Sequence, residues 1–283
     1  MTGRTALRAV VATAVTVLVV IAGCAVTRPD AAPRRTANPS PATSPTPSRP
    51  ASPPPAPQVG SCHRLTLAAA GKPTDGRPPV PCSSPHTTVT VRVGRFDPVQ
   101  DGHLLTTDSA AVQRQIADHC PGSLIGFVGG TREQRRLSRF TVVWFSPTVA
   151  QGQAGATWFR CDVIALASRD RLAQLPAQLK GVLDRPHALD RFGICGTAAP
   201  GSPRFHHVTC AQRHSWRAVS VVDLPRGSRL HGRAAGAAAN ARCKQVAASS
   251  AHGSLKYTWA FEWPTPDQWQ SGRRYGFCWL PDH

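Results

Sequence analysis

The chain has 283 residues, enough for one or two domains, and carries 33 Lys and Arg against 15 Asp and Glu, together with 27 Pro and nine Cys. A formal charge of +18 together with nine cysteines is unlike the composition of an ordinary cytosolic enzyme, and this class of protein is therefore excluded. Only four of the basic residues are lysines, so the charge lies almost entirely in Arg side chains. It reflects either coding bias or a surface for anionic partners.

The N-terminus predicts export and lipid anchoring. A short basic segment precedes a fifteen-residue apolar run, residues 9–23, which is shorter than the roughly 20 residues of a membrane-spanning helix. The run continues into Cys24 as Ile-Ala-Gly-Cys, which resembles the lipobox of bacterial lipoproteins. We expect residues 1–23 to be a lipoprotein signal peptide and Cys24 to carry the lipid, which places the chain at the outer face of the plasma membrane. A plain signal peptide and an uncleaved membrane anchor are the alternatives.

A proline-rich segment follows the lipid attachment site. Residues 28–58 hold eleven of the prolines and no large apolar side chain, so they cannot bury enough surface to offset their conformational entropy. We expect residues 24–59 to comprise the lipidated cysteine and a disordered Pro/Ser/Thr-rich stalk. Residues 60–283 retain 27 basic and 14 acidic residues, so the expected folded part is itself basic.

The other eight cysteines fall into two quartets with matching neighbours. In each quartet the second cysteine is followed four residues later by a histidine, His86 or His214, and then by a strand-like stretch of alternating valines. The fourth lies fourteen residues after a proline, Pro147 or Pro264. Shared spacing at this many points predicts an internal duplication. The quartets are Cys62, Cys82, Cys120 and Cys161, then Cys195, Cys210, Cys243 and Cys278.

The third cysteine of each quartet is expected to lie at the C-terminal end of a helix. Val112, Ile116 and Cys120 share one helical face, with Thr107 or Asp108 as the expected N-cap. The second quartet repeats this spacing with Ala235, Ala239 and Cys243. Both thiols should therefore point toward a sheet.

These patterns predict an α+β fold with two similar small disulfide-stapled domains, each an antiparallel sheet with one packed helix. We expect the first repeat over residues 60–170, a connector over 171–185 that forms a short helix or turn, and the second repeat over 186–283.

An exported chain with an even number of cysteines is typical of a disulfide framework. Eight cysteines allow 105 connectivities, but only three remain if bonds stay within each repeat and both repeats share one pattern. Metal ligation is the weaker interpretation, because the sequence has no Cys-x-x-Cys. We favour Cys62–Cys82, Cys120–Cys161, Cys195–Cys210 and Cys243–Cys278.

Four features recur along the chain: Gly-x-Cys at the start of each half, Cys-x3-His before the long strand, a cysteine at the end of a helix, and Pro-x4-Trp-x2-Gly-x5-Cys at the end. With these features each half resembles the septum formation family of actinobacterial envelope proteins, which suggests two tandem copies. The second half carries the last motif as Pro264, Trp269, Gly272 and Cys278, whereas Gly152 stands in the place of the tryptophan in the first half. The resemblance implies an envelope location and a link to division, without a known reaction.

The sequence predicts neither catalysis nor a metal or cofactor site. It contains no Gly-x-Ser-x-Gly, no His-Glu-x-x-His and no phosphate-cradling Gly-Lys-Ser/Thr, and it has only two glutamates, Glu133 and Glu262. His206, His207 and His214 lack an accompanying pattern of further ligands. We interpret the recurring His86 and His214 as structural hydrogen-bonding residues.

Arginine clusters make anion binding the leading chemical hypothesis. Export argues against nucleic acid, so we expect the partners to be the membrane through the lipid anchor, anionic lipid or cell-wall polymer, and envelope or division proteins. One cluster comprises Arg132, Arg135, Arg136 and Arg139, and the candidate anion-binding residues of the second half are Arg213, Trp216, Arg217, Arg273 and Arg274.

The sequence therefore predicts a non-enzymatic envelope lipoprotein that acts as an interaction or scaffold module linked to septum formation. The alternative is an extracytoplasmic ligand-binding or cell-wall-modifying protein that uses a groove between the repeats. A flat basic face would favour the first function. A groove lined by Trp259, Trp263, Trp269 and His214 would favour the second.

Overall fold

The computed structural model describes residues 52–251 and 256–282. The predicted signal peptide, Cys24 and the stalk as far as residue 51 lie outside this part of the chain. The described end of the stalk, residues 52–59, contains no helix or strand. None of the helices within the described ranges has both the length and the apolar character needed to cross a bilayer. The described residues all belong to one compact unit.

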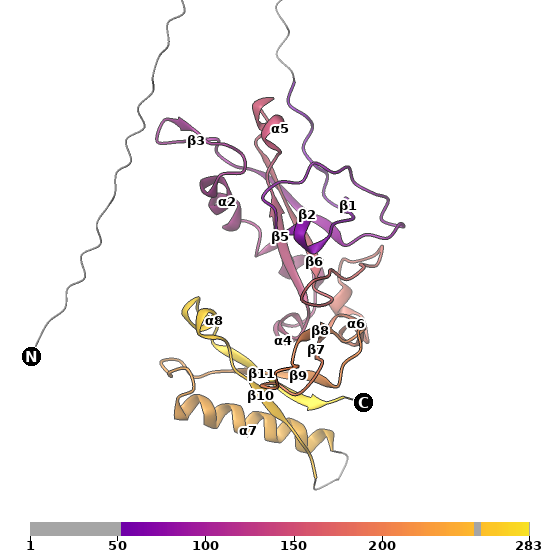
Figure 1. Cartoon of the computed structure of the whole chain (residues 1–283), viewed down its shortest axis with the longest axis vertical. Coiled ribbons are helices and arrows are strands. Elements are labelled where there is room, and N and C mark those ends of the chain that lie inside the picture. Colours follow the sequence, from indigo (N-terminus) through magenta and orange to yellow (C-terminus); the bar gives the residue numbers. More distant parts are fainter. Residues whose placement is uncertain (1–51, 252–255, 283) are drawn as a thin grey trace, which may run out of the picture. The chain divides into compact units, whose positions relative to one another are not determined.

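Four strands form an antiparallel sheet in the N-terminal half, in the order β1-β2-β6-β5 (Figure 1). Strand β6 is central and buried along its whole length, so the core of this half forms around it. The strands are β1 (Cys62–His63), β2 (Thr88–Arg95), β5 (Phe140–Phe145) and β6 (Trp158–Ala165), with a small hairpin of β3 (Val99–Gln100) and β4 (His103–Leu104). The helices are α1 (Leu67–Ala70), α2 (Ala110–Ala117), α3 (Ser123–Val128), α4 (Arg132–Arg136) and α5 (Val149–Gln153).

Five strands form the sheet of the C-terminal half, in the order β10-β11-β9-β7-β8. The long helix α7 packs against β9 and β11 through its buried alanines and Cys243. The strands are β7 (Ile194–Gly196), β8 (His207–Thr209), β9 (Trp216–Asp223), β10 (Ala260–Glu262) and β11 (Tyr275–Pro281). The helices of this half are α6 (Ala188–Phe192), α7 (Arg233–Ser250) and α8 (Pro266–Gln270). The 3₁₀ helix η1 (Val182–Asp184) precedes them in the connector, and its Val182 and Leu183 pack in the core of the N-terminal half.

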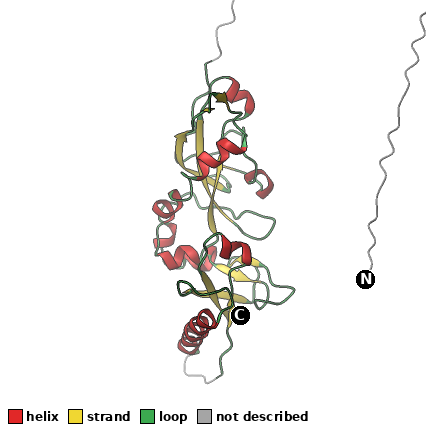
Figure 2. Cartoon of the chain, turned by 90° about the vertical axis from the view of Figure 1, so that its left-hand side faces the viewer, coloured by secondary structure: helices red, strands yellow, loops and turns green. Residues whose placement is uncertain are grey.

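The two sheets repeat one topology. The order β1-β2-β6-β5 corresponds strand for strand to β7-β9-β11-β10, and every pairing is antiparallel. The extra strand β8 pairs Val208 with Cys195, in the place where Val80 forms a single bridge to Cys62. Figure 2 shows the strands of each half gathered into a sheet with helices around them. The predicted α+β fold class is confirmed.

Four disulfides staple the halves in the pairing that the sequence favoured. Cys120–Cys161 joins the turn that follows α2 to β6, and Cys243–Cys278 joins α7 to β11. Cys62–Cys82 and Cys195–Cys210 clip the loops beside β1 and β7. They separate their cysteines by 15 to 41 residues, so each contributes roughly 3–4 kcal/mol in the chain-entropy model.

Several local expectations were wrong. The N-cap of α2 is Ser109, whose hydroxyl accepts a hydrogen bond from the N–H of Val112, and not Thr107 or Asp108. Helix α7 continues seven residues beyond Cys243, because the alanine-rich sequence after it favours further helical turns. The connector, by contrast, contains the 3₁₀ helix η1, in line with the expected short helix or turn, and Pro176 disfavours a helical conformation at Leu175.

Helices α5 and α8 occupy equivalent places and begin with the same capping box. In each helix, the threonine hydroxyl accepts a hydrogen bond from the backbone N–H of the glutamine, and the glutamine side-chain oxygen accepts one from the backbone N–H of the threonine. The pairs are Thr148 with Gln151 and Thr265 with Gln268. Gly152 in α5 stands where Trp269 stands in α8. A Cβ at residue 152 would lie 2.3 Å from the Thr107 side chain, so close packing requires glycine there.

A buried charged cluster fills one end of the N-terminal core. Arg160 in β6 is 2% exposed and forms ion pairs with Asp75 at 2.7 Å and with Asp162 at 3.3 Å. It also donates a hydrogen bond to Nε2 of His63 at 3.0 Å. Burial raises the pKa of Asp162, whereas burial and the neighbouring Arg160 lower the pKa of His63 to about 4.

The C-terminal half fills the equivalent positions with aromatic side chains. Phe277 and Trp279 flank Cys278 as Arg160 and Asp162 flank Cys161. Trp279 is fully buried and packs edge-on against Phe205 at 5.1 Å between ring centroids. One topology therefore accommodates a charged core and an aromatic core.

The His63 environment predicts a loss of stability in acid. Between pH 6.5 and about 4 the unfolded chain binds a proton at residue 63 that the folded chain does not, so stability falls as the pH decreases through this range. The expected loss is roughly 3 kcal/mol. Urea unfolding at pH 7, 5.5 and 4 should show a smaller loss for His63→Gln, whose amide still accepts from Arg160. Equal pH dependence in the two proteins would contradict the prediction.

Candidate functional site

The segment that runs from α4 into β5 connects the two halves. The Glu133 carboxylate accepts hydrogen bonds from the Ser220 hydroxyl at 2.8 Å and from the Val221 N–H at 2.9 Å, both in β9. Leu137 is buried in the core of the C-terminal half, and its carbonyl accepts from the Ile194 N–H at 2.8 Å. The polar and apolar contacts of this segment therefore hold α4 against β9 and β7.

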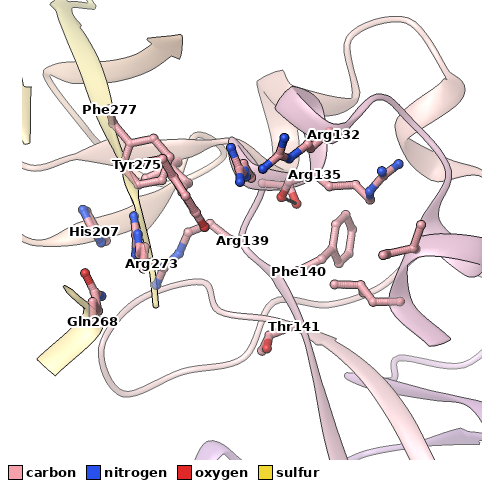
Figure 3. A pocket seen from close by; sticks show the side chains of 15 residues that line it. Arg132, Arg135, Arg139, Phe140, Thr141, His207, Gln268, Arg273, Tyr275 and Phe277 are labelled. Carbon is pink, nitrogen blue, oxygen red and sulfur yellow. Dashed lines mark hydrogen bonds between the residues drawn. The ribbon is translucent and has the colours of Figure 1, made fainter. Parts of the chain in front are cut away.

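A pocket of about 680 Å³ lies beside this segment and takes residues from both halves (Figure 3). Figure 3 shows Arg139 and Arg273 on the same side of the pocket as His207 and Gln268, and Arg132, Arg135 and Phe140 on the other side. No Asp or Glu is among its fifteen lining residues. Its charged lining comprises Arg132, Arg135, Arg136, Arg139 and Arg273.

Two of these arginines share one carboxylate that lies outside the lining. Arg136 pairs with Asp223 at 2.7 Å, and its guanidinium stacks on the Tyr275 ring at 3.9 Å. Arg132 reaches the same carboxylate at 3.8 Å, with both side chains more than half exposed. The exposed pair contributes little to stability.

The other three arginines make no ion pair within the described ranges. Arg135 donates to the backbone carbonyls of Gly129 and Gly130, and Arg139 donates from Nε to the Leu166 carbonyl at 2.9 Å. The Arg273 guanidinium carbon lies 4.5 Å from the centroid of the Tyr275 ring. Positive charge in this pocket is therefore held by carbonyl dipoles and ring faces.

Burial lowers the pKa of Arg139, and the nearby Glu262 carboxylate offsets only part of this effect. Glu262 is already engaged, since its Oε2 lies 2.9 Å from Nε2 of His207 and accepts a hydrogen bond from the indole of Trp279 at 3.1 Å. The guanidinium of Arg139 thus lies in a partly desolvated place without a bonded carboxylate. An anion would be stabilised there.

The structure separates the candidate anion-binding residues of the second half. Trp216 and Arg217 lie at one end of β9, opposite Pro281 and Leu280, whereas Asp223 at the other end pairs with Tyr275. Seven residues of strand span roughly 20 Å, so Arg273 and Arg274 are remote from Arg217. Only Arg273 lines the pocket.

The remaining candidates have other surroundings. Arg217 is neutralised by Asp282 at 2.6 Å and Asp190 at 2.9 Å. Trp216 packs against the C-terminal core, and Arg213 is exposed. Arg274 is exposed and stacks on the Trp269 ring at 4.0 Å.

The recurring histidines make the same structural hydrogen bond. Nδ1 of His86 lies 2.9 Å from the Ser84 carbonyl, and Nδ1 of His214 lies 2.6 Å from the Gln212 carbonyl. His214 also reaches Asp282 through Nε2 at 3.1 Å, close to Cys195. Cys195 is bonded to Cys210, so this group offers no thiolate for a metal.

The tryptophans do not form the groove considered from the sequence. Trp259, Trp263 and Trp269 pack around the core beneath α7. His214 lies beyond the opposite end of β9, beside Asp282. The pocket between the halves is lined by arginines instead.

Residues 60–278 match the family model described as septum formation. The chain belongs to the septum formation family. The match runs as a single unit through both halves, so two tandem copies of the septum formation family stay a prediction that the shared sheet topology supports. No curated protein and no solved structure matches the chain.

Replacing Glu133 tests the connection that shapes the pocket. Glu133→Ala removes the acceptor for Ser220 and Val221 and is expected to lower the free energy of unfolding by about 1–3 kcal/mol. Glu133→Gln keeps an acceptor oxygen and is expected to lose less. Urea unfolding at pH 7 measures both, and a loss below about 0.5 kcal/mol for the alanine variant would show that these bonds do not hold the halves together.

Proposed function

We propose that this septum formation family member is a non-enzymatic component of the cell envelope that acts as an interaction module. Lipid on Cys24 holds it at the outer face of the plasma membrane, and a proline-rich stalk separates the lipid from the folded part. The folded part engages anionic envelope material through its arginines. Family membership supports a role connected with septum formation, and four disulfides support an oxidising compartment.

The observation that carries this proposal is the group of three arginines without an ion pair in the lining of the pocket between the halves. Most arginines on a protein surface find water or a carboxylate, and an exposed cluster by itself is weak support. Here Arg135, Arg139 and Arg273 lie around one concavity, and no carboxylate lines it. Outside the membrane, phosphate-bearing lipids and polymers are the abundant anions.

The second candidate function is binding of a discrete extracytoplasmic ligand. The same pocket favours it, because about 680 Å³ is within the range of small-molecule sites. A scaffold needs only a charged face, whereas a binding protein needs a concavity with convergent polar groups. The two functions are compatible in one protein.

Lipid attachment is tested by metabolic labelling in a bacterial host. Radiolabelled palmitate is expected in the wild-type chain and not in Cys24→Ala, because no other cysteine is free of the disulfide framework. Membrane fractionation should show release of the variant from the membrane. Equal labelling of the two chains would refute the anchor.

Surface engagement is tested with lipid vesicles and the chain from residue 24 onward carrying Cys24→Ala, so that no acyl chain contributes. Cosedimentation is expected with phosphatidylglycerol vesicles and not with phosphatidylcholine vesicles, and it should weaken as salt rises from about 0.05 to about 0.5 M. Equal binding to both vesicles, or binding that is insensitive to salt, would rule out an electrostatic interaction.

A further inference from the structure

We propose that the pocket between the halves is a specific site for a phosphate group, of the kind present in phosphomonoesters and phosphodiesters. This inference rests on the proposed function and gives its pocket a ligand class. The site is built from β5 and α4 of one half and from the α8–β11 region of the other.

Arg273 is prepared to donate to a ligand. Its guanidinium carbon lies 4.5 Å from the Tyr275 ring centroid and 4.9 Å from the Phe277 ring centroid. Stacking fixes the plane of the group and leaves its N–H donors free, unlike an ion pair, which occupies them. The Nε atom of Arg273 is buried and has no hydrogen-bond partner among the described residues. A buried donor without an acceptor is costly, and a ligand oxygen would satisfy it.

Arg139 supplies a second unpaired guanidinium from the other half. Only its Nε donates, to the Leu166 carbonyl, so its terminal nitrogens are unbonded within the described part of the chain. Burial already disfavours its charge, so an anion placed beside it gains more than it would at the surface.

The chemistry of the lining favours phosphate over a single carboxylate. Arg135 adds a third guanidinium that has no carboxylate partner, and Gln268 adds an amide. Several forked donors around one concavity match a tetrahedral group with several acceptor oxygens better than a planar group with two. No Asp or Glu lines the pocket, and the nearby Glu262 is engaged by His207 and Trp279.

One wall of the pocket is apolar. Phe140 and Ile194 are buried behind it, while Leu124 and Ile125 of α3 are more open, and Ile125 is 56% exposed. This wall suits an aliphatic group attached to the phosphate. The ligand is thus a phosphate ester, which in the envelope belongs either to a lipid headgroup or to a soluble ester.

Isothermal titration calorimetry tests the site with the chain from residue 24 onward carrying Cys24→Ala, which retains every described residue. Glycerol 3-phosphate is the soluble probe, a short-chain phosphatidylglycerol below its micelle concentration is the lipid probe, and acetate is the carboxylate control. We expect one site per chain for the phosphate probes and at least tenfold weaker binding of acetate. Tighter binding of the lipid probe assigns the ligand to lipid, and equal binding assigns it to the phosphate ester alone.

Variants locate the binding. We expect Arg139→Gln and Arg273→Gln each to weaken glycerol 3-phosphate binding at least tenfold. The control is Arg213→Gln, which removes the same charge at an exposed position outside the pocket and should change the affinity less than twofold. Because the first two could also disturb packing, Ile125→Glu places a carboxylate on the open wall at an exposed position. It should also weaken binding tenfold, with the exposed Leu104→Glu in the β3–β4 hairpin as the matched control.

The outcomes separate the two proposals. If neither phosphate probe binds, or if the control variants weaken binding as much as the pocket variants, the phosphate site is wrong. Anionic vesicle binding that survives in such a case leaves the surface function standing. If glycerol 3-phosphate binds at the pocket while vesicles do not, the phosphate site stands and the membrane-surface role fails.

Discussion

The pocket depends on how Glu133 is held by β9. Its carboxylate accepts a side-chain and a main-chain hydrogen bond from the C-terminal half, at 2.8 and 2.9 Å, while Leu137 four residues later inserts into the core of that half. A short helix of five residues has little stability alone, so α4 needs these contacts and its capping box to persist. Because α4 and the three residues after it carry four of the five pocket arginines, the same contacts set where the positive charge lies.

The two halves are alike in architecture and differ in chemistry. Both halves share strand order, the disulfide from helix to central strand, and the capped helix before the last strand. Their cores differ at equivalent positions, with Arg160 and Asp162 in one and Phe277 and Trp279 in the other. The buried charges are satisfied by mutual pairing and by threonine hydroxyls, and so they have a structural role. The pocket, by contrast, lies where the halves differ and meet.

The distribution of charge separates two kinds of arginine in this chain. Arg217 has two carboxylate partners and Arg160 has two, and each is thereby part of the framework. Arg273 instead stacks on the rings of Tyr275 and Phe277, and Arg139 donates a hydrogen bond to the Leu166 carbonyl. Partner type, more than the number of basic residues, therefore distinguishes a binding surface from a stabilising ion pair.

The sequence by itself determined the fold class, predicted a duplication and favoured the disulfide pairing that the structure contains, because cysteine spacing and the alternation of valines are local properties that repeat along the chain. The spacing also placed Val112, Ile116 and Cys120 on one buried face. It missed the short helices α1, α3, α4, α5, α6 and α8, whose four to six residues are too few to show a helical period, although the Thr131–Gln134 capping box was a readable signal for α4. It recognised Arg132 to Arg139 as a basic cluster, but it grouped Arg273 with its sequence neighbour Arg274.

Only the tertiary structure decided that Arg273 joins Arg139, 134 residues earlier, and that Arg217 is neutralised. The physical reason is that the electrostatic state of an arginine depends on which carboxylates and rings the fold brings within a few ångströms, and contacts between distant residues leave no periodic trace in the sequence.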